Sequence, residues 1–232
     1  MAFRYENVVP WGRSYEEYLR MFDLRPDDLK GRILGCADGP ASFNSELTRR
    51  GGRVVSVDPL YELSAGEIAQ RIEETCDEVI SQTQREQQRF VWDMIGSVEE
   101  LARIRMAAMK AFLDDYEAGK SDGRYLAAGL PDLPFDDGAF DLALSAHFLF
   151  LYTDQLSLDF HRVGLLELCR VAREVRIFPL LDVNGVRSHH LEPILDELES
   201  GGLDVEIRQV PYEFQRGGNQ MLSIRGPATR TG

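Results

Sequence analysis

The sequence predicts an α/β fold in which a mostly parallel, twisted sheet is flanked by helices and finished by a C-terminal antiparallel hairpin. An apolar strand at Arg32–Cys36, a turn of small residues, a helix and a second strand at Arg53–Val57 follow one another closely. This is the order of a βαβ unit, which requires parallel strands. Near the end of the chain, two strand-like segments at 204–212 and 220–225 are joined by a short glycine-containing loop. Such a loop makes them antiparallel neighbours.

An N-terminal helical segment, residues 1–30, precedes the first strand. Aromatic and apolar residues recur at helical spacing from Tyr15 to Phe22. Ser14 is the expected N-cap, and Glu17 stands where a capping box needs it.

The helix of the βαβ unit is expected from about Ser42 to Arg50, and Asp58 closes the second strand. From residue 63 to 122 the sequence becomes polar and helical, with a break near Gly96 and a stop expected at Gly119. One helix would suffice between the second and third strands, so this segment is a helical insertion. It is a candidate lid over a ligand, and padding of the sheet or a dimer contact is the alternative.

After the insertion, strands and helices alternate again and complete a single domain over residues 1–232. Strands are expected at 125–128, 140–145 and 175–181, and helices at 158–172 and 188–200.

The composition excludes several classes of partner and of site. The formal charge of −13 speaks against a nucleic-acid partner, because such partners are held mainly by clustered Lys and Arg. Three widely spaced cysteines indicate neither a disulfide framework nor a zinc site, and His189 and His190 lack ligands at metal-binding spacing. The sequence begins without the apolar stretch of a signal peptide, and its most apolar run is too short to span a bilayer. We therefore expect a cytoplasmic protein with no metal and no membrane partner; its oligomeric state is open.

The turn after the first strand, RILGCADGPASF at residues 32–43, is the first candidate site. Its small residues let a ligand approach the backbone, and the turn lies where open α/β sheets bind ligands. Asp58 follows Gly39 by 58 − 39 = 19 residues, the distance at which an acid accepts hydrogen bonds from ribose hydroxyls. The alternative is an Asp that only opens an Asp-Pro turn.

This turn resembles the first motif of class I S-adenosylmethionine-dependent methyltransferases. The hydrophobic pair before the turn and Gly39 match the motif, while Ala37 and Ala41 replace its outer glycines. Gly35 stands where the family carries an acid; the resemblance implies that the nearby Asp38 or a water takes that acid's place, and low affinity for the cofactor is the alternative.

A second stretch, residues 130–152, is similar to the family's segment between the third and fourth strands. The register puts Gly129 where many members carry an adenine-binding Asp, so the resemblance implies adenine contacts from the backbone near Leu130 and Pro131. The resemblance covers roughly residues 30–60 and 125–225. The matching residues are Leu133-Pro134-Phe135, Asp137-Gly138 and Phe140-Asp141.

The resemblance implies S-adenosylmethionine as cofactor. Arg13 is expected to pair with its carboxylate, and a ring such as Tyr18 to face its sulfonium; packing of this amphipathic helix is the alternative. The residues expected at the cofactor are Arg13, Tyr18, Gly35, Cys36, Ala37, Asp38, Gly39, Asp58, Pro59, Leu130, Pro131, Ser145 and Ala146.

His147 follows the fourth strand and is the candidate catalytic base, since an imidazole titrates near neutrality. Its apolar neighbours make a packing role the alternative, and we expect packing or exposure for His161. From position alone, Phe214, Arg216 and Asn219 are expected to border the acceptor site.

The sequence thus predicts methyl transfer from S-adenosylmethionine to an unidentified small-molecule acceptor. A non-catalytic protein of the same fold that binds S-adenosylmethionine or a nucleoside is the first alternative. An NAD-dependent oxidoreductase is disfavoured, because the G-x-G-x-x-G motif is absent and the sheet ends in an antiparallel hairpin.

Overall fold

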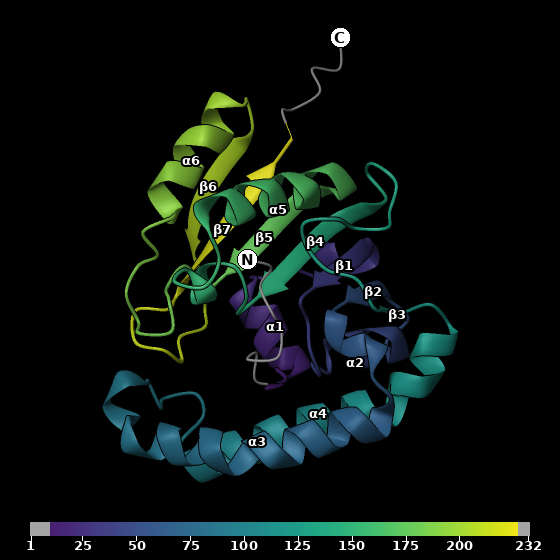
Figure 1. Ribbon diagram of the computed structural model, residues 1–232, viewed down its shortest axis with the longest axis vertical. Helices are drawn as coiled ribbons and strands as arrows, with labels where there is room; N and C mark the ends of the chain where they lie inside the picture. Colours follow the sequence, from purple (N-terminus) through teal and green to yellow (C-terminus); the bar gives the residue numbers. More distant parts are fainter. Residues whose placement is uncertain (1–9, 227–232) are drawn as a thin grey trace.

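The computed structural model describes residues 10–226, whose seven strands form one sheet in the order β3-β2-β1-β4-β5-β7-β6 (Figure 1). Neighbouring strands from β3 to β5 are parallel, while β7 runs antiparallel to both β5 and β6. The predicted fold class is confirmed: the sheet is Rossmann-like, mostly parallel, and ends in a C-terminal antiparallel hairpin. The strands are β1 Arg32–Cys36, β2 Arg53–Val57, β3 Tyr125–Leu126, β4 Phe140–Ala146, β5 Ala172–Phe178, β6 Asp204–Gln209 and β7 Gln220–Arg225.

Alternating side chains of the central strands pack against helices on the two faces of the sheet. Ile33 and Leu142 pack with α1 and α2, while their neighbours Leu34 and Ala143 pack with α5 and α6. Successive strand residues point to opposite faces, so strands buried on both faces are continuously apolar. The four helices are α1 Tyr15–Met21, α2 Phe43–Arg49, α5 Leu158–Val171 and α6 Leu191–Ser200.

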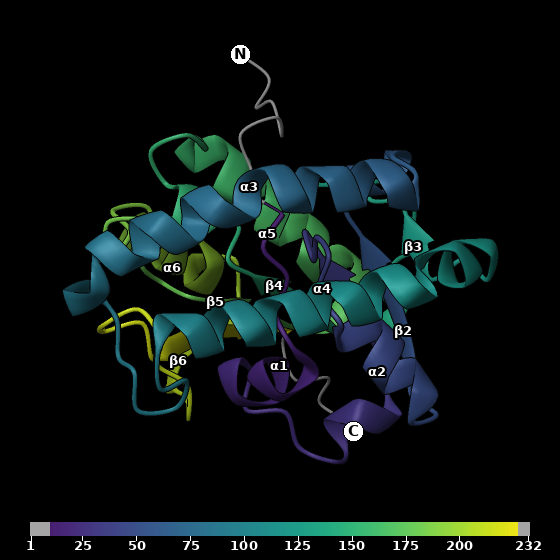
Figure 2. The ribbon, with the colours of Figure 1, turned by 90° about the horizontal axis from the view of Figure 1, so that it is seen from below.

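The insertion between β2 and β3 contains two long helices, α3 (Ala65–Arg85) and α4 (Val98–Ser121). They run side by side across the end of the molecule at which the parallel strands terminate (Figure 2). Short 3-10 turns, η3 (Pro59–Glu62) and η4 (Gln87–Arg89), precede and follow α3. The helix stop expected at Gly119 is wrong, because α4 continues to Ser121. A glycine is required there because a Cβ would lie 2.4 Å from the Tyr125 ring.

The two inserted helices are buried to very different extents. Helix α4 buries a series of residues including Met109, Phe112 and the fully buried Arg105, whereas the 21-residue α3 buries only Ile68, Ile72 and Thr83. Helix α4 is therefore part of the domain's framework, and α3 is mainly a cover. Within residues 10–226, no helix combines the length and the apolar character needed to cross a membrane.

Some element bounds differ from expectation. Strand β3 has two residues because the chain leaves the sheet after Leu126, and β5 begins at Ala172 because α5 passes directly into extended backbone there. Helix α6 begins at Leu191, after a turn whose backbone bond joins the Leu191 amide to the Ser188 carbonyl.

Candidate functional site

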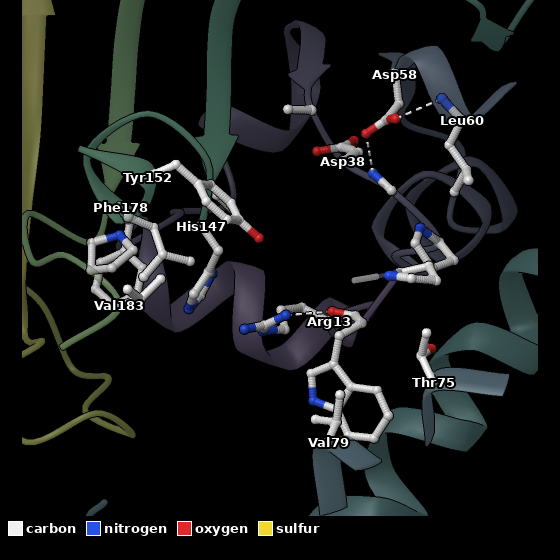
Figure 3. A pocket seen from close by; sticks show the side chains of 18 of the residues that line it. Arg13, Asp38, Asp58, Leu60, Thr75, Val79, His147, Tyr152, Phe178 and Val183 are labelled. Carbon is white, nitrogen blue, oxygen red and sulfur yellow. Dashed lines mark hydrogen bonds between the residues drawn. The ribbon is translucent and has the colours of Figure 1, made fainter. Parts of the chain in front are cut away.

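A cavity of about 880 Å³ lies at the carboxyl ends of the parallel strands (Figure 3). The segments after β1, β2, β4 and β5 line it together with the β6–β7 loop, helix α3 and the segment before α1. Strands β1 and β4 are adjacent at the centre of the sheet, where the strand order reverses, and open α/β sheets bind ligands at this point.

The turn after β1 is shaped by Asp38. A Cβ on Gly35 would lie 1.8 Å from the Asp38 Oδ2 atom, so the Asp38 carboxylate occupies the space that a side chain at position 35 would need. Ala37 and Gly39 adopt left-handed backbone conformations, with φ of 59° and 51°. Left-handed backbone in a residue other than glycine is uncommon and is concentrated at functional turns.

The Asp38 carboxylate is buried within the protein's own hydrogen bonds. Its Oδ1 accepts from the Tyr18 hydroxyl at 2.8 Å, and its Oδ2 accepts from the Ser56 hydroxyl at 2.6 Å. Burial raises the pKa of Asp38 to about 6, the charge of Asp58 acts in the same direction, and the two hydrogen bonds oppose the shift. Each oxygen keeps a lone pair for a further donor.

Asp58 joins the ends of β1 and β2. Its Oδ2 accepts from the Gly39 backbone N–H at 2.8 Å, and its Oδ1 accepts from the Leu60 N–H at 2.8 Å. Burial raises the pKa of Asp58, and the two donated N–H groups act against that rise. Asp58 therefore opens the Asp-Pro turn after β2, which was the alternative interpretation of this residue, and it also lines the cavity.

Arg13 places a buried cation in the cavity wall. Its Nη1 donates to the Trp11 carbonyl, and its Nε is buried with no hydrogen-bond partner among the described residues. Burial, and after it the nearby Arg105 guanidinium, lower the pKa of Arg13 to about 10. The carboxylate of Glu17 is already engaged by Arg105 and by the Tyr212 hydroxyl, at 2.7 Å from the latter. Arg13 therefore has capacity left for an anionic group.

His147 lines the cavity directly after β4 in a left-handed conformation with φ of 55°. Its backbone N–H donates to the Phe178 carbonyl at 2.6 Å, and its ring lies edge-on to the Phe178 ring at 5.5 Å between centroids. The Nδ1 atom is buried without a partner in the described part of the chain. Burial places the pKa of His147 well below its usual value, and the Arg13 and Arg105 charges lower it further. The imidazole is therefore neutral at pH 7.

The insertion is joined to the β6–β7 loop at the side of the cavity beyond His147. Phe90 stacks on Phe214 at 4.6 Å between centroids, and the Val91 N–H donates to the Phe214 carbonyl at 2.7 Å. Arg216 and Asn219 hold this junction and its loop: Arg216 donates to the Phe90 carbonyl at 3.2 Å, and Asn219 donates to a Glu213 oxygen at 2.9 Å. Of the three loop residues singled out from the sequence, Phe214 lines the cavity.

The structure brings most of the predicted site residues together. Gly35, Cys36 and Ser145 instead lie within the strands, Leu130 packs in the core against Gly164, and Pro131 is exposed. The predicted residues that line the cavity are Arg13, Tyr18, Ala37, Asp38, Gly39, Asp58, Pro59, Ala146 and His147.

Several residues that line the cavity were not predicted, because they lie in segments that carry no motif. Leu151 and Val183 come from the segments after β4 and β5, while Thr75 and Val79 come from α3. His161 is fully buried, and both of its ring nitrogens lie within hydrogen-bond distance of backbone oxygens, which is the expected packing role. In residues 10–226, no group of three or more His, Cys, Asp or Glu side chains is arranged to hold a metal ion.

The strand order and the cavity define an α/β protein of Rossmann-like architecture with a site at the reversal point of its sheet. The chain is 34% identical over 221 residues to the uncharacterized protein MJ0045 of Methanocaldococcus jannaschii, covering 95% of this chain and 97% of that protein. It therefore belongs to the same family as that protein. No protein-family model matches the chain.

Solved structures resemble the chain at much lower identity. One is magnesium protoporphyrin IX methyltransferase from Synechocystis with bound S-adenosylmethionine: identity is 10%, the TM-score is 0.45, and the match covers 86% of this chain and 72% of that one. Another is an S-adenosylmethionine-dependent methyltransferase from Thermotoga maritima, with 15% identity, a TM-score of 0.43, and coverage of 92% and 88%.

Proposed function

We propose that the protein is a methyltransferase that uses S-adenosylmethionine and transfers its methyl group to a small molecule. The observation that carries this proposal is the convergence of three features on one cavity at the centre of the sheet edge: Asp58, the side-chain-poor turn at Ala37–Gly39, and Arg13, whose Nε has no partner among the described residues. Ligand pockets commonly measure about 300–1,000 Å³. A cavity of about 880 Å³ is near the upper end of that range, in keeping with a donor and an acceptor held together.

The residues present fit this donor. Asp58 ends β2 and lines the cavity with an oxygen pair suited to ribose hydroxyls. Arg13, with its buried and unpartnered Nε, suits the donor's carboxylate, and such charge-assisted pairs are strong. Asp38 and the Tyr18 ring lie nearby, where a carboxylate and a π-face favour a positively charged ligand.

The donor supplies an activated methyl group on a positively charged sulfur. The protein's task is then to orient the acceptor, and alignment of two reactants contributes on the order of 7–11 kcal/mol to lowering a barrier. Helix α3 lines the cavity with Thr75 and Val79 and is proposed to act as its lid, excluding water during the reaction. The neutral His147 is positioned to accept a proton from the acceptor.

Calorimetric titration with S-adenosylmethionine tests the proposal. We expect saturable binding by the wild-type protein and at least tenfold weaker binding by Asp58→Asn, which is about 1.4 kcal/mol. Glu62→Gln is the matched control, because Glu62 is an exposed acid that lines the same cavity a few residues further on, and its binding should change less than threefold. Absence of binding at millimolar donor, or equal binding by Asp58→Asn, contradicts the proposal. Donor binding without methyl transfer to any acceptor offered favours the non-catalytic alternative.

A further inference from the structure

The cavity wall beyond His147 differs in chemistry from the wall formed by the turns after β1 and β2. We call it the acceptor chamber. Figure 3 shows Phe178 and Val183 beside His147, on the opposite side of the pocket from Asp38 and Asp58, with Arg13 between the two groups. The chamber is defined by Phe90, His147, Leu151, Phe178, Val183 and Phe214.

No residue that defines the acceptor chamber carries a charge at neutral pH. The acids among the described lining residues lie on other segments: Asp38 and Asp58 after β1 and β2, and Glu62 and Glu74 in the insertion. The cations whose charge acts on His147 are Arg13 and Arg105. A cationic acceptor would therefore lie near Arg13, and near Arg105 in its pair with Glu17, with no carboxylate in the chamber to pair with it, and a buried charge without a partner is strongly disfavoured.

We propose that the methyl acceptor is an uncharged, largely apolar hydroxy compound of the phenol class, with its ring in the acceptor chamber and its hydroxyl against the His147 imidazole. This inference rests on the proposed function and adds the acceptor class to it. Four hydrophobic side chains supply the apolar walls that such a ring needs: Leu151 after β4, Phe178 and Val183 at and after the end of β5, and Phe214 in the β6–β7 loop.

The same geometry disfavours the other common nucleophiles. An alkyl amine is protonated at pH 7, since its pKa is about 10.4, and would enter as a cation. A carboxylate would need a cation of its own, whereas Arg13 is assigned to the donor. An aliphatic hydroxyl is far less acidic than a phenol, whose pKa of about 10 falls further beside a positive charge.

The transfer balances with the groups present. The phenol oxygen forms a bond to the methyl carbon, the carbon–sulfur bond breaks, and its electron pair stays on the sulfur, which becomes a neutral thioether. The phenol proton passes to an imidazole nitrogen of His147 and then to solvent. The positive charge that the sulfur loses leaves the cavity with this proton, so no buried cation remains on His147.

Three naphthalene probes of matched size test the acceptor class by calorimetry at pH 7.5 with saturating S-adenosylhomocysteine, which covers the charged groups of the donor end. We expect 2-naphthol, which is neutral, to bind at least tenfold more tightly than the cationic 2-(aminomethyl)naphthalene and the anionic 2-naphthoate. His147→Asn tolerates the left-handed backbone and should weaken 2-naphthol binding about fivefold, the equivalent of one hydrogen bond.

Val183→Asp provides a charge test in the chamber wall. Val183 is 41% exposed, so the variant should fold, and we expect it to reverse the preference from 2-naphthol to the cationic probe. Val186→Asp is the matched control, because Val186 lies in the same loop, is 61% exposed and does not line the cavity. The Val186→Asp variant should keep the wild-type order of affinities for the probes.

The outcomes separate this inference from the proposed function. Equal or tighter binding of the cationic probe to the wild-type protein overturns the acceptor class, as does an unchanged order in Val183→Asp. Failure of 2-naphthol to bind, with S-adenosylmethionine still bound, overturns the inference and leaves the methyltransferase proposal standing. Binding of 2-naphthol in the expected order without S-adenosylmethionine binding supports the chamber and contradicts the proposed donor.

Discussion

The two ends of the cavity are built in contrasting ways. At the donor end, defined by Ala37, Asp38, Gly39 and Asp58, strand ends and backbone groups make the wall, and the carboxylates accept hydrogen bonds from the protein itself. The acceptor chamber is made instead mainly from apolar side chains, most of them on loops and on the insertion, with Phe178 at the end of β5. Polar groups fixed by the sheet give a preorganised surface, whereas loop side chains can change without disturbing the sheet. The proposed donor site is therefore tied to the fold, and the proposed acceptor site to its peripheral segments.

One buried network connects the two ends. Arg105 of α4 pairs with Glu17 of α1, which also accepts from Tyr212 at the start of the β6–β7 loop. Through these contacts the insertion, the N-terminal helix and the wall of the chamber hold one another. Variants in this network should affect ligand binding at both ends of the cavity, whereas variants at one end should affect mainly that end.

Arg105→Met should have the largest effect. Removing one partner of a buried ion pair typically costs about 3–5 kcal/mol, because the remaining charge has no partner, and Glu17 is almost fully buried. We expect that loss of unfolding free energy in urea, with weaker ligand binding at both ends. Arg103→Met on the same helix breaks only the exposed pair with Glu100 and should cost less than about 0.5 kcal/mol. Similar losses in the two variants would contradict a shared buried support.

Gly35→Ala should damage the donor end selectively. Its Cβ would lie 1.8 Å from Asp38 Oδ2, so the carboxylate must leave its hydrogen bonds, at a cost of about 2–4 kcal/mol. Gly66→Ala, in the first turn of α3 with open space around it, should stabilise by up to about 1 kcal/mol. Adding Asp38→Ala to Gly35→Ala should recover part of the loss by removing the clash. Chemical denaturation measures all three, and no recovery in the double variant would show that Asp38 is not the obstacle.

Asp38 gives the donor end a pH dependence of stability opposite in sign to that of His147 in the acceptor chamber, whose pKa is lowered by burial. Its folded pKa of about 6, against the usual 3.8, means that the native state holds this proton more tightly. The resulting stabilisation is complete below about pH 4 and is lost as the pH rises through 6, with a magnitude of about 2–3 kcal/mol. Asp38→Asn should therefore gain stability relative to wild type between pH 4 and 7. Parallel pH profiles of unfolding free energy for the two proteins would contradict this assignment.

The residues of the site that can be predicted from the sequence lie mainly at the donor end, and those that cannot lie mainly in the acceptor chamber. The strand–turn–helix pattern and the Asp58 spacing depend on local sequence, and from them the sequence predicts a ligand site at the ends of the first two strands. The link between Gly35 and Asp38 was only partly visible, because the carboxylate folds back over the strand in three dimensions. Val183 and Phe90 had no motif, and they reach the chamber through contacts between distant segments. Long-range loop packing leaves no periodic signal in a single sequence.

Phe214→Ala should have the smallest effect on stability and act on the acceptor chamber alone. It removes the stack on Phe90 and one chamber wall, at a cost of about 1–2 kcal/mol, because aromatic pairs contribute about 0.5–1.5 kcal/mol beyond their buried area. Amide hydrogen exchange should speed up in η4 and the distal half of α3, which depend on this junction. S-adenosylmethionine binding should stay within threefold of wild type while 2-naphthol binding falls about tenfold. Leu166→Ala, at a 43% exposed position on α5, is the control and should leave both affinities unchanged. An equal loss of both ligands in Phe214→Ala would mean that the two ends are not independent, because the junction would then support the whole cavity.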